Sequence, residues 1–220
     1  MKAIVIGATG GIGAAIFRAL ESAGADATAL SRSGDGLDLA DEASIARATE
    51  TLDGPFDLIF DATGALVIDG AGPEKTIAAI DPAAMAAQFA LNAIGPALLL
   101  KHFHPLLPKD RRGLFVTLSA RVGSIGDNGL GGWISYRASK AALNQIVRTA
   151  AIEIARRRPE AVVAALHPGT VRTDLTAKYA GNHPTVSPDE AATNLLAVID
   201  GLTPEDSGGF FAWDGKRIPW

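Results

Sequence analysis

Several classes of protein are excluded by what this chain lacks. None of its 220 residues is cysteine, which excludes disulfides, thiolate nucleophiles and cysteine-based zinc sites. A basic face of the kind that nucleic-acid scaffolds need is also missing, because the formal net charge is −4. The N-terminal apolar run is too short for a secretory signal, and the apolar residues 93–100 fall short of the roughly 20 that span a bilayer. We therefore expect a cytoplasmic protein with no nucleic-acid or membrane partner.

The composition that is present favours one folded domain. With 48% hydrophobic and 20% charged residues, the chain has enough apolar material for a sizeable core. Short apolar runs at residues 4–6, 27–30, 58–60, 114–118, 162–166 and 210–213 predict strands buried on both faces. Segments of helical period lie between them, at residues 12–22, 42–52, 83–104, 136–157 and 188–199. This alternation predicts a single α/β domain over residues 1–220, a doubly wound, Rossmann-type parallel sheet with helices on both faces.

A glycine-rich loop joins the first predicted strand to the first predicted helix. Gly7 permits a tight turn, Gly11 lets the backbone approach a pyrophosphate, and Gly13 lets the helix pack against the strand. Thr9, Gly10 and Ile12 complete the expected binding loop. The spacing is GxxxGxG, and no GK[ST] follows, which argues against a phosphate-hydrolysing P-loop. The loop therefore predicts a dinucleotide site, against the alternative of a purely structural turn.

The end of the second strand bears on which dinucleotide binds. An NAD-preferring site usually places a carboxylate here, and Ser31 cannot take that role. Arg32, with Ser33 beside it, could neutralise a 2′-phosphate, which favours NADP over NAD. The alternative is that Arg32 is only a solvated loop charge.

Tyr136 and Lys140 are spaced i and i+4, on one face of a predicted helix. A phenol has a pKa of about 10, and a neighbouring ammonium lowers that pKa by favouring the phenolate. Such a pair can exchange protons with an alcohol or carbonyl oxygen. The YxxxK pattern alone is a common accident, so its weight depends on the motifs around it.

Together these motifs resemble the short-chain dehydrogenase/reductase family over essentially the full length of the chain, most like its C-factor and sniffer-type carbonyl reductase branch. Gly7, Gly11 and Gly13 match the family's cofactor glycines, and Tyr136 and Lys140 match its catalytic pair. The resemblance also implies that Asn92 holds a proton-relay water. It implies further cofactor contacts at Asp38 and Leu39 (adenine), at Ala62, Thr63 and Gly64 (the family's Asn-rich turn), and at Pro168, Gly169, Val171 and Thr173 (nicotinamide carboxamide).

The chain departs from the family pattern at two places. Aligned on Gly123, the position of the family's catalytic serine is occupied by Ala120, and Ser119 falls one residue earlier. Either Ser119 or Ser124 reaches the substrate oxygen through local irregularity, or that oxygen lacks a serine donor, a loss typically of about 10²–10³ in rate. Asp61 stands where the family has asparagine, which adds negative charge near the adenosine half of the cofactor.

These observations predict an NADP(H)-dependent oxidoreductase acting on a carbonyl compound or secondary alcohol, with no metal. Tyr136 is the expected proton donor, Lys140 and Asn92 its supports, and Ser119 the provisional oxygen donor. The alternative is an NAD(P)-binding regulatory or signalling protein of the same fold with weak or no turnover. We further expect a mobile substrate loop at residues 169–186, and a homodimer or homotetramer formed through the two Ala- and Leu-rich helices.

Overall fold

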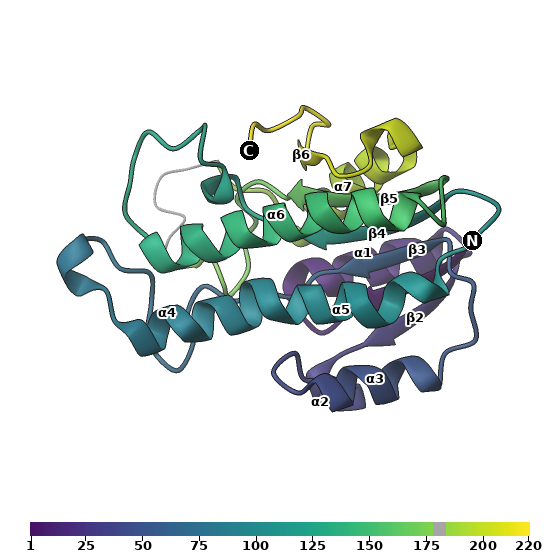
Figure 1. Cartoon of the computed structure of the whole chain (residues 1–220), viewed down its shortest axis with the longest axis horizontal. Helices are drawn as coiled ribbons and strands as arrows, with labels where there is room; N and C mark the ends of the chain where they lie inside the picture. Colours follow the sequence, from purple (N-terminus) through teal and green to yellow (C-terminus); the bar gives the residue numbers. More distant parts are fainter. Residues whose placement is uncertain (178–183) are drawn as a thin grey trace.

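A computed structural model describes residues 1–177 and 184–220 of the chain (Figure 1). Six strands form one parallel sheet in the order β2-β1-β3-β4-β5-β6, with crossover connections between them. The strands are β1 (Lys2–Ile6), β2 (Asp26–Leu30), β3 (Leu58–Asp61), β4 (Gly113–Leu118), β5 (Ala161–His167) and β6 (Phe210–Ala212). This confirms the predicted doubly wound α/β fold, and each expected strand is found within a few residues of its predicted bounds.

Helices cover both faces of the sheet. On one face lie α1 (Gly11–Ser22) and α7 (Pro188–Gly201); on the other lie α3 (Glu42–Glu50), α5 (Gly95–Phe103) and α6 (Ile134–Ala155) (Figure 1). Side chains cap the first turns of α3 and α7: Asp41 accepts the N–H of Ala43, and Ser187 accepts the N–H of Glu190. A single turn, α2 (Arg32–Asp35), follows β2 and was not predicted.

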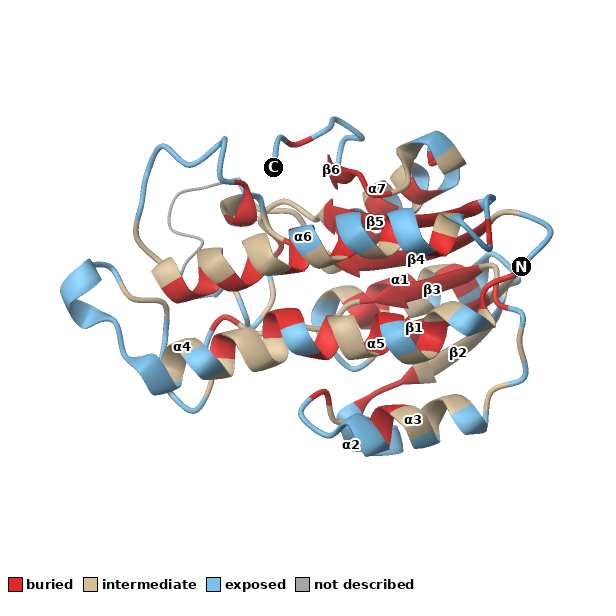
Figure 2. Ribbon diagram, viewed as in Figure 1, coloured by how far each residue is buried: buried red, intermediate tan, exposed pale blue. Residues whose placement is uncertain are grey.

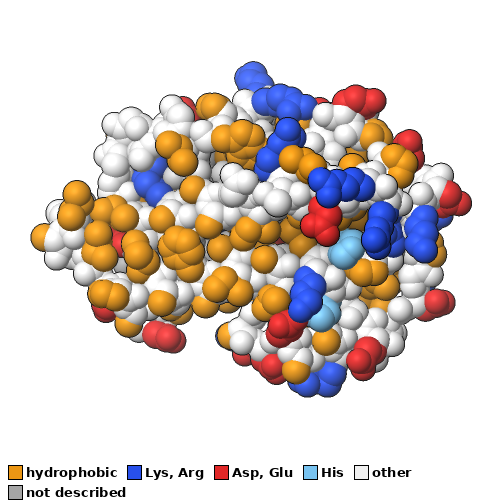
Figure 3. Space-filling view, viewed as in Figure 1, with side chains coloured by type: hydrophobic (Ala, Val, Ile, Leu, Met, Phe, Trp, Pro, Cys, Tyr) orange, Lys and Arg blue, Asp and Glu red, His pale blue; other side chains and the backbone are white. Residues whose placement is uncertain are grey.

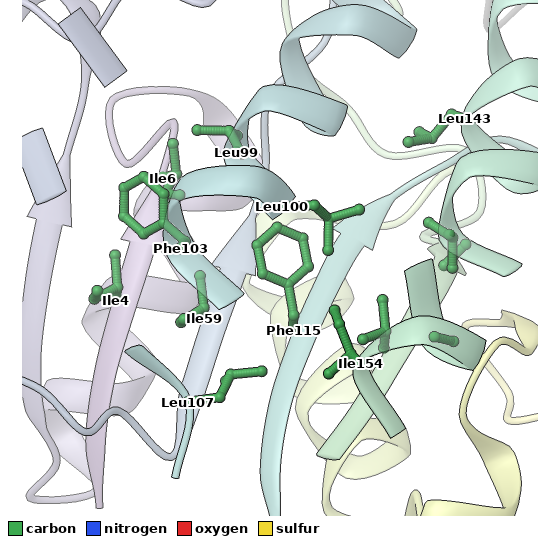
Figure 4. Close-up of a cluster of buried hydrophobic side chains, with 14 of the residues drawn as sticks. Ile4, Ile6, Ile59, Leu99, Leu100, Phe103, Leu107, Phe115, Leu143 and Ile154 are labelled. Carbon is green, nitrogen blue, oxygen red and sulfur yellow. The ribbon is translucent and has the colours of Figure 1, made fainter. Parts of the chain in front are cut away.

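The sheet divides the hydrophobic core in two. Alternate strand residues point to opposite faces, so Ile4 and Phe115 join the cluster under α5 and α6, whereas Val5 and Val116 join the cluster under α1 and α7. Figure 4 shows the first cluster, in which strand side chains meet Leu99, Leu100 and Phe103 of α5. Burial on both faces explains why the strands are continuous apolar runs (Figure 2).

The helix expected at residues 83–104 is longer and less regular than predicted. It consists of α4 (Pro82–Phe89), a π-helical segment (Ala90–Ile94) and α5, and a 3₁₀ turn (His104–Leu106) follows. From the sequence, residues 93–100 were expected to be too short to span a bilayer. The helical segment Pro82–Leu106, with a mean hydropathy of 1.6, is long and apolar enough to do so by length and composition alone. Its α5 part packs on the sheet as a core helix through Leu99 and Phe103.

The carboxyl ends of β1, β3, β4 and β5 meet at one edge of the sheet, where open α/β sheets bind their ligands. The expected loop at residues 169–186 begins at this edge. Residues 178–183 lie outside the described part of the chain. On either side of them, Val171 and Val186 pair as a β-bridge, and Arg172 donates its N–H to the carbonyl of Val186 at 2.9 Å.

Candidate active site

In the glycine loop, the backbone of Gly7 lies close to that of Leu30 and of Gly13. Gly7 adopts a φ of +80° and donates its N–H to the carbonyl of Leu30 at 2.8 Å. A Cβ on Gly13 would lie 2.2 Å from the carbonyl oxygen of Gly7, and one on Gly11 would lie 2.6 Å from Cγ2 of Thr173. The helix that follows begins after Gly10 without a side-chain cap, so its first N–H groups can receive an anion. The residues present therefore fit a nucleotide pyrophosphate, and they bring Thr173 beside the loop.

At the end of β2, the carboxylate of Asp35 lies closer to Ser31 than the sequence suggested. Ser31 is buried and caps α2, accepting the N–H of Gly34 at 2.9 Å, and its own N–H is donated to Oδ2 of Asp35 at 2.9 Å. Arg32 and Ser33 are exposed in the same turn. Sequence reasoning missed Asp35 because it considered only the residues at the strand end, whereas one helical turn folds the fourth residue back onto them.

The expected adenine contacts, Asp38 and Leu39, have partners within the protein. Asp38 accepts the N–H of Ala40 at 2.9 Å, and its own N–H is donated to Oγ of Ser44 at 2.9 Å. Leu39 is buried against Gly95, where a Cβ would lie 2.8 Å from that of Leu39. Gly95 thus lets α5 approach this segment.

Lys140, Asn92 and Gly64 converge at the sheet edge. The backbone of Gly64 has a φ of +136°, and a Cβ there would stand 3.0 Å from Oδ1 of Asn92 and 3.3 Å from Nζ of Lys140. Nζ of Lys140 donates to the carbonyl of Leu118, at the end of β4, at 2.9 Å. Tyr136 lies one turn earlier on α6, with 9% of its surface exposed. Residues from the segment after β3, the π-helical segment, the end of β4 and α6 therefore meet in one small region.

Burial governs the ionisation of the Tyr–Lys pair in this structure. Burial raises the pKa of Tyr136 to about 12 and lowers the pKa of Lys140 to about 8. The sequence suggested that the Lys140 ammonium would lower the pKa of the phenol; in this structure the pKa is raised instead, and burial is the cause. The phenol of Tyr136 therefore keeps its proton near neutral pH.

Asp61 is a buried carboxylate beside this cluster. Its two oxygens accept the N–H and Oγ1–H of Thr63 at 2.9 and 2.5 Å and the Oγ1–H of Thr117 at 2.7 Å. Burial raises the pKa of Asp61, opposed by these three hydrogen bonds and by the charge of Lys140. The same attraction raises the pKa of Lys140 against the effect of its own burial.

The side chain of Asn92 is fully engaged with the protein. Oδ1 accepts the N–H of Ala65 at 3.0 Å, and Nδ2 donates to the carbonyl of Ala65 at 2.9 Å and to Oε1 of Gln88 at 2.7 Å. Gln88, also buried, donates to the carbonyl of Leu66 at 3.0 Å. The amide of Asn92 thus fixes the segment after β3 against the π-helical segment.

The hydroxyl of Ser119 has its partner farther along α6 than Tyr136. Its Oγ donates to Oδ1 of Asn144 at 2.7 Å, and Asn144 lies two turns, about 12 Å along the helix axis, beyond Tyr136. Ser124 is equally engaged: its Oγ donates to the carbonyl of Pro219 and accepts the N–H of Asp127 at 3.1 Å. Both hydroxyls that the sequence offered as oxygen donors have partners within the protein.

Around β5, the expected carboxamide loop lies at the same sheet edge. Gly169 has a φ of +77° and packs against the indole of Trp213, and Val171 is buried. His167, which ends β5, has a buried Nδ1 with no hydrogen-bond partner among the described residues. Burial lowers the pKa of His167 to about 4, so this imidazole is neutral at physiological pH.

Two residues that sequence reasoning missed lie at the start of α6. Trp133 precedes the helix in the left-handed conformation, with a φ of +55°, and its ring meets the ring of Tyr136 edge-on at a centroid distance of 6.3 Å. Glu74, from the long connection after β3, accepts hydrogen bonds from the first turn of the helix. No local motif marks Glu74, which is 61 residues distant from Ser135 in sequence.

Comparisons with known proteins agree with this geometry. A family model described as short chain dehydrogenase matches residues 1–183. The chain is 33% identical over 232 positions to a 1-hydroxy-2-glutathionyl-2-methyl-3-butene dehydrogenase of Rhodococcus sp. (strain AD45), covering 99% of this chain and 98% of that one. It is 37% identical over 177 residues to C-signal of Myxococcus xanthus, covering 79% of this chain and 98% of the relative.

Solved structures show the same architecture. An NADPH-bound carbonyl reductase from chicken fatty liver superposes with a TM-score of 0.85 at 25% identity, covering 100% of this chain and 98% of the other. The carbonyl reductase Sniffer of D. melanogaster superposes with a TM-score of 0.82, covering 100% and 99%. At 20% identity, this second likeness supports the fold alone.

Proposed function

The chain belongs to the short-chain dehydrogenase/reductase family and is an NAD(P)-dependent oxidoreductase, and from this premise we propose that it interconverts a carbonyl compound and the corresponding secondary alcohol using NADP(H). When bound, the cofactor supplies or accepts the hydride. The protein residues bind the cofactor, orient the substrate and move the proton. The observation that carries the proposal is the convergence of Lys140, Asn92 and Gly64 one turn from Tyr136.

In the direction of reduction, Tyr136 donates its phenolic proton to the carbonyl oxygen. Its pKa of about 12 keeps the phenol protonated at neutral pH but makes it a weak acid, so proton transfer depends on a charge that stabilises the phenolate that forms. Lys140, anchored on Leu118, carries the charge that stabilises the phenolate left after transfer and holds the nicotinamide ribose. Asn92, whose amide is occupied by Ala65 and Gln88, positions the relay water through its main chain.

The cofactor-binding surface in this proposal follows the sheet edge. The loop from Gly7 to Gly13 would hold the pyrophosphate, and Arg32 would bind the 2′-phosphate, which favours NADP over NAD. The remaining proposed contacts are Thr9, Gly10, Gly11, Ile12, Ser31, Ser33, Asp38, Leu39, Ala62, Thr63, Gly64, Pro168, Gly169, Val171 and Thr173.

A second candidate function is regulatory nucleotide binding with little turnover. The engaged hydroxyls of Ser119 and Ser124 favour it, because an oxygen donor missing from the site would slow catalysis. The full-length similarity to a protein named C-signal is consistent with it. The buried Tyr136 and Lys140 favour the enzyme, since a pure binding protein has no need of that pair.

The deciding experiment is NADPH consumption with a panel of aldehydes, ketones and quinones, and NADP⁺ reduction with secondary alcohols. Because the name of one relative describes a glutathionyl alcohol, the panel includes an alcohol that carries a glutathione thioether. Turnover of any member supports the enzyme. NADPH binding without turnover of the whole panel supports the regulatory protein.

A further inference from the structure

The connection between β3 and α4, residues 62–81, is tied at two points to the residues proposed for catalysis. Its first part is held by Asn92 and Gln88, which bind the backbone of Ala65 and Leu66. Its middle part is held by the start of α6. A β-bridge between Ile68 and Ala71 and a short 3₁₀ turn (Ile77–Ala79) interrupt its irregular path. In Figure 1 this segment lies beside the first turn of α6, at the end of the molecule where α4 lies. Connections of this length without regular structure are commonly functional.

Glu74 makes the second attachment with both its backbone and its side chain. Its carbonyl oxygen accepts the N–H of Trp133 at 2.6 Å. Its carboxylate oxygen Oε1 accepts the N–H of Ser135 at 3.0 Å and also the Oγ–H of Ser135. These contacts bracket the residue at which α6 begins and reach the residue directly before Tyr136.

The helix itself provides no substitute for Glu74. The residue that precedes it is Trp133, which makes no side-chain cap, and its first turn contains no acidic residue. A helix N-terminus leaves backbone N–H groups without partners and favours a carboxylate. Glu74 supplies that carboxylate from a distant part of the chain. Burial raises the pKa of Glu74, but the hydrogen bonds from Ser135 outweigh this and hold it below its usual value, so the group is ionised at neutral pH.

We propose that Glu74 is a positioning residue for the proton donor: by capping the first turn of α6 through Ser135, it fixes the ring of Tyr136 at the sheet edge. The inference rests on the proposed function. Tyr136 follows Ser135 directly, so any rotation or fraying of the first turn moves the phenol. Ser135 is 4% exposed. The backbone N–H of Trp133 is donated to the carbonyl of the same glutamate, and the ring of Trp133 meets the ring of Tyr136 edge-on. Proton transfer needs the donor within about 3 Å of the substrate oxygen, so a small displacement of the phenol is costly.

The variants Glu74→Ala and Glu74→Gln separate this role from simple stabilisation. Glutamine keeps an oxygen that accepts from Ser135, whereas alanine removes it. Glu153→Ala, which removes an exposed carboxylate from the last turns of the same helix, is the matched control. For a carbonyl that the unaltered enzyme reduces, we expect Glu74→Ala to lower kcat by about tenfold or more with NADPH affinity unchanged. Glu74→Gln should restore most of kcat, and Glu153→Ala should leave it unaltered.

NMR spectra of labelled tyrosine provide a second measurement, which does not depend on the activity used to test the proposed function. The chain has two tyrosines, Tyr136 and Tyr179, so ring-labelled tyrosine gives two signals in NMR spectra, which Tyr136→Phe assigns. Glu74→Ala should shift or broaden the Tyr136 signal, Glu74→Gln should restore it, and Glu153→Ala should leave it in place. An unchanged Tyr136 signal in Glu74→Ala, an unchanged kcat of the folded variant, or a glutamine variant as impaired as the alanine variant would overturn the proposal. If no panel carbonyl is reduced by the unaltered protein, the proposed function fails and the NMR result alone decides the role of Glu74.

Discussion

Two single residues of the site, Asp61 and Lys140, are both buried. Burial favours the neutral form of each, because it raises the pKa of Asp61 and lowers the pKa of Lys140. Their mutual attraction acts in the opposite direction. The family pattern has asparagine where this chain has Asp61. The added carboxylate raises the pKa of the buried Lys140 and so favours its charged form. As the pH rises, Lys140 therefore loses its proton before Tyr136 does.

This dependence can be measured in the free enzyme. Because the pKa of Lys140 is about 8, its ammonium is present below that pH and lost above it. We therefore expect kcat/KM for NADPH to fall as the pH rises through this value, in a profile from about pH 6 to about pH 10. Asp61→Asn removes the attraction that raises the pKa of Lys140, so the fall should begin at a lower pH. Asp57→Asn, which changes a carboxylate directly before the first residue of β3 and so at the opposite end of that strand, should leave the profile unchanged. A fall at the same pH in Asp61→Asn and the unaltered protein would contradict the pairing.

Cofactor choice is the second prediction at this scale. If Arg32 contacts the 2′-phosphate, one charge-assisted hydrogen bond contributes roughly 1.5–3 kcal/mol, so NADPH should bind at least about tenfold more tightly than NADH. Arg32→Ala should erase most of that preference. Asp35→Asn should increase it, because the carboxylate beside Ser31 repels a phosphate. Arg47→Ala, an exposed arginine on α3, is the control, and the measurement is the dissociation constant of each cofactor. Equal affinities for the two cofactors in the unaltered protein would refute the assignment.

Single residues show where sequence reasoning stops. The glycine spacing and the Tyr–Lys spacing could be predicted because each depends on neighbours within one loop or one helix turn. The partner of Ser119 could not, because Asn144 is 25 residues away and is brought close only by packing of α6 against β5 and the 3₁₀ turn after β4. Glu74 was missed for the same reason.

At the scale of elements, the strands and the long helices were predicted well, since burial on two faces and helical period are local signals. The π-helical segment at Ala90–Ile94 was not. It ends directly before Gly95 and Pro96, and Asn92 within it binds the backbone of Ala65. That tertiary contact has no counterpart in the local pattern.

The junction of β1 and α1 gives a prediction for one element. Gly13→Ala would place a Cβ 2.2 Å from the carbonyl oxygen of Gly7, and neither backbone can move without distorting the loop. We expect a loss of about 1–3 kcal/mol in the free energy of unfolding, together with weaker NADPH binding. Gly201→Ala at the end of α7 meets no atom within 4 Å, so it should be neutral or stabilising by up to about 1 kcal/mol. Urea unfolding measures both, and a Gly13→Ala protein as stable as the parent would contradict the packing described.

At the scale of the whole molecule, hydrophobic side chains gather on the face formed by α4, α5 and α6. Figure 3 shows them over α4 and the adjoining end of α6, with charged side chains concentrated at the opposite end of this view. Two isoleucines of this face are about half exposed: Ile94, at the end of the π-helical segment, and Ile152, in the last turn of α6. The single domain over residues 1–220 and the cytoplasmic location stay predictions, as does the assembly state.

We expect this face to pair two copies of the chain. Light scattering at micromolar concentration should give at least the mass of a dimer, and Ile94→Glu combined with Ile152→Glu should reduce it to the monomer mass, because charges cannot be buried unpaired in an apolar interface. Leu130→Glu, which changes a fully exposed leucine in the loop before α6, should leave the assembly intact. A monomeric mass for the unaltered protein would refute the prediction.

The central claim is that Tyr136 is the proton donor, and Tyr136→Phe tests it most directly because the change removes one oxygen and leaves the ring to pack against Trp133. The measurement is the single-turnover rate of NADPH oxidation with a carbonyl that the parent reduces, beside the thermal midpoint and the NADPH dissociation constant of both proteins. The account predicts a rate at least about 100-fold lower, with folding and cofactor affinity nearly unchanged. A Tyr136→Phe protein that turns over at the parent rate would contradict it.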